Sequence, residues 1–185
     1  SCCAPMGWPY LRQAQSDAAR AAGNAGLAVT IDAGEWNDLH PEKKQTVGKR
    51  AALEALRVAY GKSYISAAPR VTKVVANKAK CLVHFDCGNS SLVAHQVNGK
   101  AAELDHEAKD KKVQGFSCLF ITKGKMNTVA AQAKLISDYD VEVSIPRGQG
   151  ALIELHYLWG DNPAPVNLYS RDLLPAAPFN INLEE

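Results

Sequence analysis

The sequence changes its pattern near Tyr60, and this change limits the folds that are open to the chain. Before Tyr60, helix-like periodicity surrounds one short apolar run. After it, short β-like runs follow one another, separated by turns rich in glycine, asparagine and lysine. Such runs are typical of an antiparallel sandwich. The expected strands are residues 70–76, 79–85, 113–122, 129–136, 141–145 and 151–159.

The part before Tyr60 predicts a helix, a strand, a loop and a second helix. Residues 26–33 are mostly apolar and bounded by glycines, which suits a strand buried on both faces of a parallel sheet. A polar loop, 34–40, leads to a helix opened by Pro41. This order is that of the end of an α/β layered domain. The apolar positions expected to be buried are Leu11, Ala14, Ala18 and Ala21 or Ala22 in a first helix over 9–23, and Val47, Ala51, Ala55, Leu56 and Tyr60 in the second.

These patterns divide the chain into three parts. Residues 1–62 form the α/β portion, 63–160 a β-rich, sandwich-like domain, and 161–185 an extended C-terminal arm. The arm is rich in proline and is expected to dock on a surface without forming another element. The chain begins at Ser1 and runs almost directly into a helical pattern, which indicates a fragment or a processed subunit.

Composition and charge exclude several classes of protein. The chain is 46% hydrophobic and 22% charged, as in a globular protein, and its net charge of +2 implies no strongly charged partner. Lysines near residue 110 alternate with acidic residues, which indicates a solvated loop and not a nucleic-acid surface. No apolar stretch of about 18 residues occurs, so no membrane span is expected.

Five cysteines and the absence of a CxxC pair bear on metal binding and redox chemistry. Without such a pair, a zinc site is not expected, and no motif indicates a cofactor. Cys81 and Cys87 flank a predicted turn and are expected either to pair or to be buried free thiols.

The loop after the predicted buried strand carries the candidate chemistry, Asp38-Leu39-His40-Pro41. In α/β sheets, ligands bind beyond the carboxyl ends of the strands. A serine hydrolase needs a histidine to take the serine proton and a carboxylate to orient the imidazole. His40 and Asp38 supply that pair locally. The alternative is a helix cap, in which Asp38 or His40 binds the amides of the next helix.

The remaining histidines and serines give no second site. His84 and His156 lie in predicted strands and are expected to be structural, while His95 and His106 lie in polar sequence and are expected to be exposed. No Gly-x-Ser-x-Gly elbow and no Gly-Asp-Ser turn occurs. The chain therefore offers a general base without a nucleophile.

Two ordered motifs resemble sialate O-acetylesterase and the related acetylxylan esterases. The first is the run 28–50, with its Asp-Leu-His-Pro string followed by Lys-Gln-x-Val-Gly-x-Arg. The second comprises 157–163, 167–169 and 174–179, and Gly115-Phe116 also falls where the family has Gly-Phe. The resemblance covers nearly the whole chain.

The resemblance implies the C-terminal part of a carbohydrate O-acetylesterase. Such enzymes have a three-layer, SGNH-hydrolase-like α/β domain and remove acetyl groups from sugars with a serine, a histidine and an aspartate. His40 would be the histidine, and the serine would come from an N-terminal portion or chain that this sequence lacks. The substrate would be an acetylated sugar or glycan, and the location secreted, periplasmic or lysosomal rather than cytoplasmic.

Two questions stay open at this point. Asp38 is the nearest carboxylate to His40, but Glu35 and Asp32 are alternatives, and the position three before His40, where the wider class has its acid, is Asn37. Many relatives also read Gly-Asp where this chain has Gly34-Glu35. The rival function is a non-catalytic carbohydrate-binding or accessory module.

Overall fold

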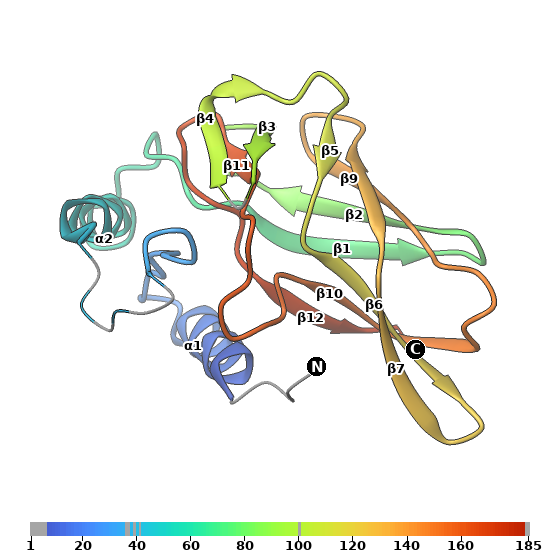
Figure 1. Cartoon of the computed structure of the whole chain (residues 1–185). Helices are drawn as coiled ribbons and strands as arrows, with labels where there is room; N and C mark the ends of the chain where they lie inside the picture. The colour runs from blue at the N-terminus through green and yellow to red at the C-terminus, as the bar shows by residue number, and fades with distance from the viewer. Residues whose placement is uncertain (1–6, 36–37, 39, 41, 100, 184–185) are drawn as a thin grey trace.

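The computed structural model describes residues 7–35, 38, 40, 42–99 and 101–183. Within these residues, two helices lie against a region of three antiparallel sheets (Figure 1). The helices are α1, Trp8–Ala22, and α2, Lys44–Val58. They lie on the same side of the β region.

Helix α1 confirms the predicted first helix but not its predicted buried face. Proline in its first turn and the left-handed Gly23 after its last residue set its limits. Pro9 and Ser16 are buried, whereas Leu11 is 48% exposed and Ala14 and Ala18 are exposed. The apolar stripe is therefore largely exposed within the described residues.

Helix α2 shows the same inversion. It begins at Lys44 and not at Pro41, which lies outside the described residues. Arg50 and Glu54 are buried, while Leu56 and Tyr60 are exposed. The expectation that Ala51, Ala55, Leu56 and Tyr60 form the buried face is wrong within this chain, because the side of the helix that carries Arg50 contacts the segment before the loop, where Arg50 donates to the carbonyl of Val29.

Residues 26–33 form no strand, which corrects the prediction of a parallel one. Val29 and Ala33 are buried, as the apolar pattern predicts. The carbonyls that a neighbouring strand would bind are instead met by side chains: Arg50 donates to the carbonyl of Val29 at 3.0 Å and Arg70 to that of Leu27 at 3.3 Å. A strand needs a paired neighbour, and the described residues supply none here.

The β region consists of three sheets that share one core. The first has the order β1-β2-β9-β8-β5, the second β12-β10-β6-β7 and the third β11-β3-β4, and all pairs are antiparallel. The strands are β1 Arg70–Ala76, β2 Lys80–Asp86, β3 Leu92–Asn98, β4 Ala101–Glu107, β5 Lys112–Val113, β6 Phe116–Thr122, β7 Lys125–Ala130, β8 Gln132–Leu135, β9 Asp140–Ser144, β10 Ala151–Tyr157, β11 Leu168–Ser170 and β12 Phe179–Asn182.

Alternation along the strands builds the core. In β2, Cys81, Val83 and Phe85 point inward and are fully buried, while the residues between them are exposed. The ring of Phe116 in β6 lies 4.8 Å from that of Tyr157 in β10, and Phe179 of β12 packs against both. The prediction of an antiparallel β region is therefore confirmed.

Several strand limits differ from the prediction. The run 113–122 is divided between β5 and β6 at Gly115, whose φ of 91° is left-handed. The run 129–136 spans the end of β7 and the whole of β8. β3 and β4, which contain His95 and His106, lie in sequence for which no strand is predicted. The expectation that the C-terminal arm holds no element is wrong, since β11 joins β3 and β12 joins β10.

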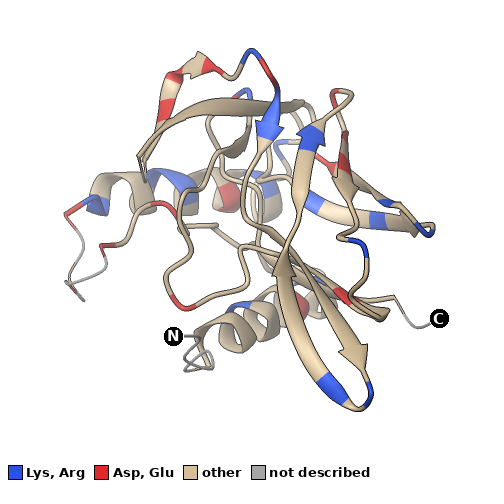
Figure 2. Ribbon diagram, turned by 45° about the vertical axis from the view of Figure 1, so that its right-hand side comes forward, with Lys and Arg blue, Asp and Glu red and all other residues tan. Residues whose placement is uncertain are grey.

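Basic and acidic side chains are scattered over the helices, strands and loops (Figure 2). Lys80 pairs with Glu142 at 2.8 Å, which is one such contact across β2 and β9. None of the described helices is long and apolar enough to cross a membrane.

Candidate functional site

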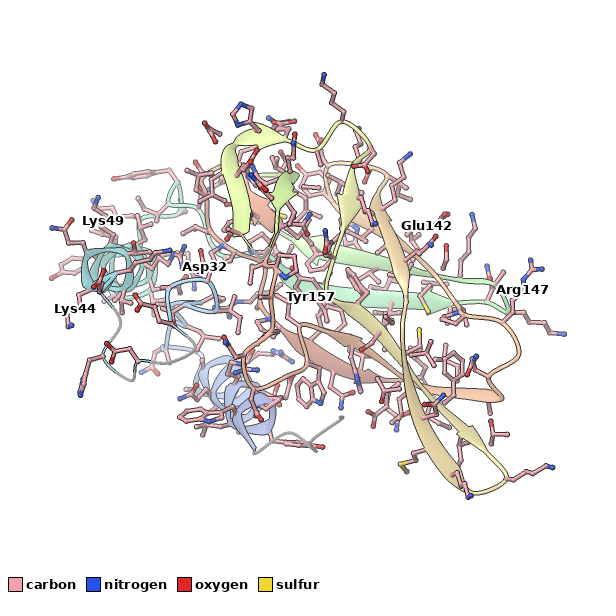
Figure 3. The ribbon with its side chains drawn as sticks, viewed as in Figure 1. Asp32, Lys44, Lys49, Glu142, Arg147 and Tyr157 are labelled. Carbon is pink, nitrogen blue, oxygen red and sulfur yellow. The ribbon has the colours of Figure 1, made fainter. Side chains whose placement is uncertain are left out.

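The loop between residue 31 and α2 carries the predicted site residues. The chain enters it through a turn in which the N–H of Ala33 donates to the carbonyl of Thr30 at 3.0 Å. Asp32 lies in this turn, on the side of the loop that faces α2 and the β region (Figure 3). The start of the loop is thus fixed next to the body of the molecule.

Asp32 is held by two other elements. Arg50 of α2 donates to Oδ1 at 2.5 Å and to Oδ2 at 2.8 Å, and the hydroxyl of Tyr169 in β11 donates to Oδ2 at 3.1 Å. The Asp32 and Arg50 side chains are 14% and 8% exposed. Both carboxylate oxygens are engaged, so Asp32 serves as a structural link and not as a free partner for His40.

Burial and the neighbouring Asp32 carboxylate raise the pKa of Tyr169 above its ordinary value. The phenol therefore keeps its proton and stays a donor to Asp32 throughout the ordinary pH range. An ionised carboxylate that accepts from a guanidinium and a phenol forms a charge-assisted, partly buried network.

Asp38 and His40 are brought together through the backbone. Asp38 Oδ1 accepts a hydrogen bond from the backbone N–H of His40 at 2.7 Å, the arrangement of an Asx turn. Both residues are exposed, and the His40 imidazole has no hydrogen-bond partner among the described residues. The pair thus shares one turn, but the contact expected of a catalytic dyad is not formed.

The interpretation of Asp38 or His40 as a helix cap is wrong. Helix α2 begins at Lys44 with Lys43 at the cap position, so neither Asp38 nor His40 is the cap residue. The Asp38 carboxylate is used inside the loop instead. Its place is therefore not explained by the needs of the helix.

Glu35 lies opposite Asp38 across the loop. The backbones of these two residues form an isolated antiparallel bridge, which brings the two carboxylate-bearing residues to the same narrow turn. Asn37, the position at which the wider esterase class has its acid, lies outside the described residues. Glu35 is exposed and thus accessible to a neighbouring histidine.

A groove of about 680 Å³ runs beside this turn. Glu35 and Asp38 contribute carboxylates to it, and Trp8 and Leu11 contribute apolar surface from α1. Arg12 is held at its edge by the carbonyls of Gly160 and Asp161. The groove therefore combines acidic groups with apolar walls next to the candidate histidine.

The chain resembles part of a known carbohydrate esterase. The crystal structure of the carbohydrate acetylesterase XAC1771 from Xanthomonas citri matches it with a TM-score of 0.74 and 32% sequence identity. The match covers 95% of this chain and 36% of that chain, so this chain spans about a third of the length of its relative. No protein-family model matches, and neither does any curated protein.

The match shows a resemblance to part of a carbohydrate acetylesterase. It extends over both the helical part and the β region, because 95% of the chain is covered. The catalytic roles of His40 and Asp38 stay predictions.

The other histidines lie outside this loop. His95 is 4% exposed, so the expectation that it is exposed is wrong; the edge of its ring packs against Tyr169 at 5.4 Å. His156 is buried and its Nε2 lies 2.7 Å from Glu154 Oε2. His84 pairs with Asp140 at 2.8 Å on the exposed face of β2. His106 is exposed, as predicted.

The described cysteines are poor nucleophiles and form no disulfide bond. Cys81, Cys87 and Cys118 are free and buried, which decides between the two alternatives for Cys81 and Cys87. Burial raises the pKa of Cys81 and of Cys118 to about 11 and that of Cys87 to about 12. Thiols with such values stay protonated at neutral pH. The residues that the structure describes also hold no group of three or more side chains suited to a metal ion.

Sequence reasoning assigned no role to Arg50 or Tyr169. Arg50 is the last residue of the Lys-Gln-x-Val-Gly-x-Arg motif, and Tyr169 closes the run 167–169. Their membership in the two motifs was the available signal. Only the fold shows that both side chains meet at Asp32, because Tyr169 is separated from it by 137 positions.

Proposed function

We propose that this chain is the C-terminal part of a carbohydrate O-acetylesterase of the sialate O-acetylesterase type. His40 is the general base of its serine triad. The observation that carries the proposal is the match to a carbohydrate acetylesterase over 95% of the chain at 32% identity. The exposed turn that holds Asp38 and His40 supplies the residue types that such a reaction needs.

In the proposed reaction, a serine hydroxyl from outside this chain attacks the acetyl carbonyl while His40 takes its proton. His40 then gives that proton to the departing sugar hydroxyl, which leaves an acetyl-enzyme. Water repeats the cycle and releases acetate. The imidazole of His40 is exposed and has no hydrogen-bond partner among the described residues, so it is available for both transfers.

Asp38 is the proposed orienting carboxylate. Its Oδ1 binds the His40 amide, which fixes the distance between the two residues, and Oδ2 stays available to accept from the imidazole N–H. Asp32 is disfavoured because Arg50 and Tyr169 hold both of its oxygens. Glu35 lies across the same turn and is the acid to test against Asp38.

The inverted helices support a missing serine-bearing portion. Trp8, Tyr10 and Leu11 of α1 are 50%, 60% and 48% exposed, and Leu56 of α2 is 37% exposed. A lone soluble domain rarely directs the apolar stripe of two helices outward. The portion with the serine would cover these faces and pair with residues 26–33, which completes the proposed three-layer α/β domain.

The deciding experiment uses the chain joined to, or purified with, its serine-bearing portion. Wild-type and His40→Ala proteins are compared with acetylated sugars and with a fluorophosphonate probe of reactive serines. His40→Ala should lower kcat by about 10³- to 10⁶-fold. His106→Ala, which alters an exposed histidine of β4, is the matched control and should retain activity.

Near-full activity of His40→Ala would overturn the assignment of the base. Labelling of no chain by the probe, combined with binding of glycans, would instead favour a non-catalytic module. The 185-residue chain alone should not hydrolyse p-nitrophenyl acetate, because it lacks the proposed nucleophile.

A further inference from the structure

The hydroxyl of Tyr169 connects the C-terminal segment to the loop of the candidate site. It donates to Asp32 Oδ2 at 3.1 Å, and Tyr169 itself is only 2% exposed. Arg50 joins the same carboxylate from α2 and also donates to the carbonyl of Val29 at 3.0 Å. The Asp32 carboxylate therefore joins the start of the loop to α2 and to β11, which is 137 positions away.

We propose that Tyr169 is a positioning residue for the loop that carries Asp38 and His40, acting through Asp32. The proposal rests on the proposed function for its catalytic consequence, but not for its effect on the loop. We call Asp32, Arg50 and Tyr169 the loop latch.

The position of the latch explains why it acts on the whole loop. Asp32 lies at the start of the loop, and Arg50 lies in the helix that follows it, so their ion pair holds both ends. The pair alone joins only the loop and α2. Tyr169 adds a hydrogen bond from the β region to Asp32 itself, because β11 is paired with β3; Ile31 and the carbonyl of Leu27 also contact the β region.

The environment of Tyr169 favours a fixed contact. The rings of Tyr169 and His95 pack in a T-shaped arrangement with 5.4 Å between their centroids, and all residues of β11 are buried. The phenol keeps its proton because burial and Asp32 raise its pKa. A rigid donor on a paired strand can place a loop within the tolerance that catalysis requires.

If Tyr169 contributed only to the stability of the fold, Tyr169→Phe would give a different pattern of amide exchange. Loss of one buried hydroxyl leaves the ring and its packing in place, so Tyr169→Phe should not loosen the core of the β region. If Tyr169 positions the loop, the change is confined to residues that depend on Asp32. Amide exchange separates the two cases, because it reports local opening residue by residue.

The test begins with amide hydrogen exchange by NMR on the 185-residue chain, with wild-type and Tyr169→Phe proteins. The amides of Ala33 and His40 should exchange at least about tenfold faster in the variant, while those of Val83 and Val143 in the core stay unchanged. Tyr139→Phe, which removes a hydroxyl from the exposed turn between β8 and β9, is the matched control. Arg50→Lys should resemble Tyr169→Phe, because lysine cannot bind a carboxylate bidentately, whereas Arg57→Lys in the same helix should not.

The second measurement uses the enzyme assembled with its serine-bearing portion. Tyr169→Phe should lower kcat about tenfold with KM changed less than twofold, because the loop is misplaced and the sugar contacts are kept. Unchanged exchange at Ala33 and His40, or equal acceleration throughout the core, overturns the proposal. If Tyr169→Phe accelerates exchange at the loop but His40→Ala stays fully active, the loop latch is supported and the proposed function is overturned.

Discussion

Asp38 accepts a hydrogen bond from the backbone N–H of His40, with 2.7 Å between Oδ1 and the amide nitrogen, and no described residue binds the imidazole of His40. In the described structure, the Asp38 carboxylate stabilises the backbone turn, whereas its role in orienting the His40 ring is proposed. A single residue can do both, because a carboxylate has two oxygens and each accepts independently.

Substitution of Asp38 separates these two effects. Asp38→Asn keeps an oxygen that can accept from the His40 amide, so the turn should persist, but the charge that stabilises the imidazolium is lost. We expect kcat of the assembled enzyme to fall by up to about 10⁴-fold in Asp38→Asn. Steady-state kinetics with an acetylated sugar measure this, and the matched variant is Glu35→Gln. A larger loss in Glu35→Gln than in Asp38→Asn would transfer the orienting role to Glu35.

The buried His95 should make the fold sensitive to acid. Burial lowers its pKa below the ordinary 6.5, and the backbone carbonyl of His106 and the carboxylate of Glu107 only partly oppose this. The stability that the neutral ring contributes is therefore present above pH 6.5 and is lost as the pH falls through the lowered pKa. The urea midpoint should drop between pH 7.5 and 5.5 by more in the wild type than in His95→Phe. His106→Gln, at an exposed position, should behave as the wild type; equal drops in wild type and His95→Phe would contradict the prediction.

Gly150 should tolerate no side chain. Its φ is +96°, and a Cβ would meet the Thr122 hydroxyl and the backbone carbonyl of Ile121 closer than any real contact allows. Gly148, with φ +74°, has open space instead. Gly148→Ala should cost about 1–2 kcal/mol from backbone strain alone, and Gly150→Ala about 1–3 kcal/mol more. Thermal unfolding of the two variants compares them directly, and equal costs would show that the turn relaxes.

The contribution of the exposed apolar side chains of α1 and α2 to stability should depend on whether the serine-bearing portion is present. Leu11→Ala and Leu56→Ala should each change the unfolding free energy of the 185-residue chain by less than about 0.5 kcal/mol, because both side chains are exposed. In the protein that includes the serine-bearing portion, each should cost about 2–5 kcal/mol. Leu155→Ala, in the core of the β region, should cost that much in both. Urea unfolding gives these values, and equally small costs for Leu11→Ala and Leu56→Ala in both proteins would exclude the proposed cover.

The sequence predicted where the helices lie better than which side they bury. The stripe through Leu11, Ala14 and Ala18 is a correct amphipathic pattern, yet it is exposed here. Periodicity reports that some surface is covered, but not which part of the protein covers it. This chain spans 36% of the length of its relative, so an amphipathic helix in it can have its apolar face exposed within the described residues. Residues 26–33 show the same effect, because an apolar run becomes a strand only beside a partner.

The β region shows where the sequence signal was weakest. β4 is largely exposed on both faces, so no alternation marks it, and its pairing with β3 shifts register next to His95. The loop latch was equally hidden, because a contact across 137 positions leaves no local pattern. By contrast, β2 and its Cys81, Val83 and Phe85 alternation could be predicted almost to the residue.

The placement of β11 and β12 in two different sheets has a consequence for the order of synthesis. Until residues 168–182 leave the ribosome, β3 and β10 each present one unpaired edge. The nascent β region is thus exposed to non-native strand pairing during that interval, and the loop of the candidate site also lacks its Tyr169 contact. Premature termination within this span would release a chain that is both prone to aggregate and unable to order that loop.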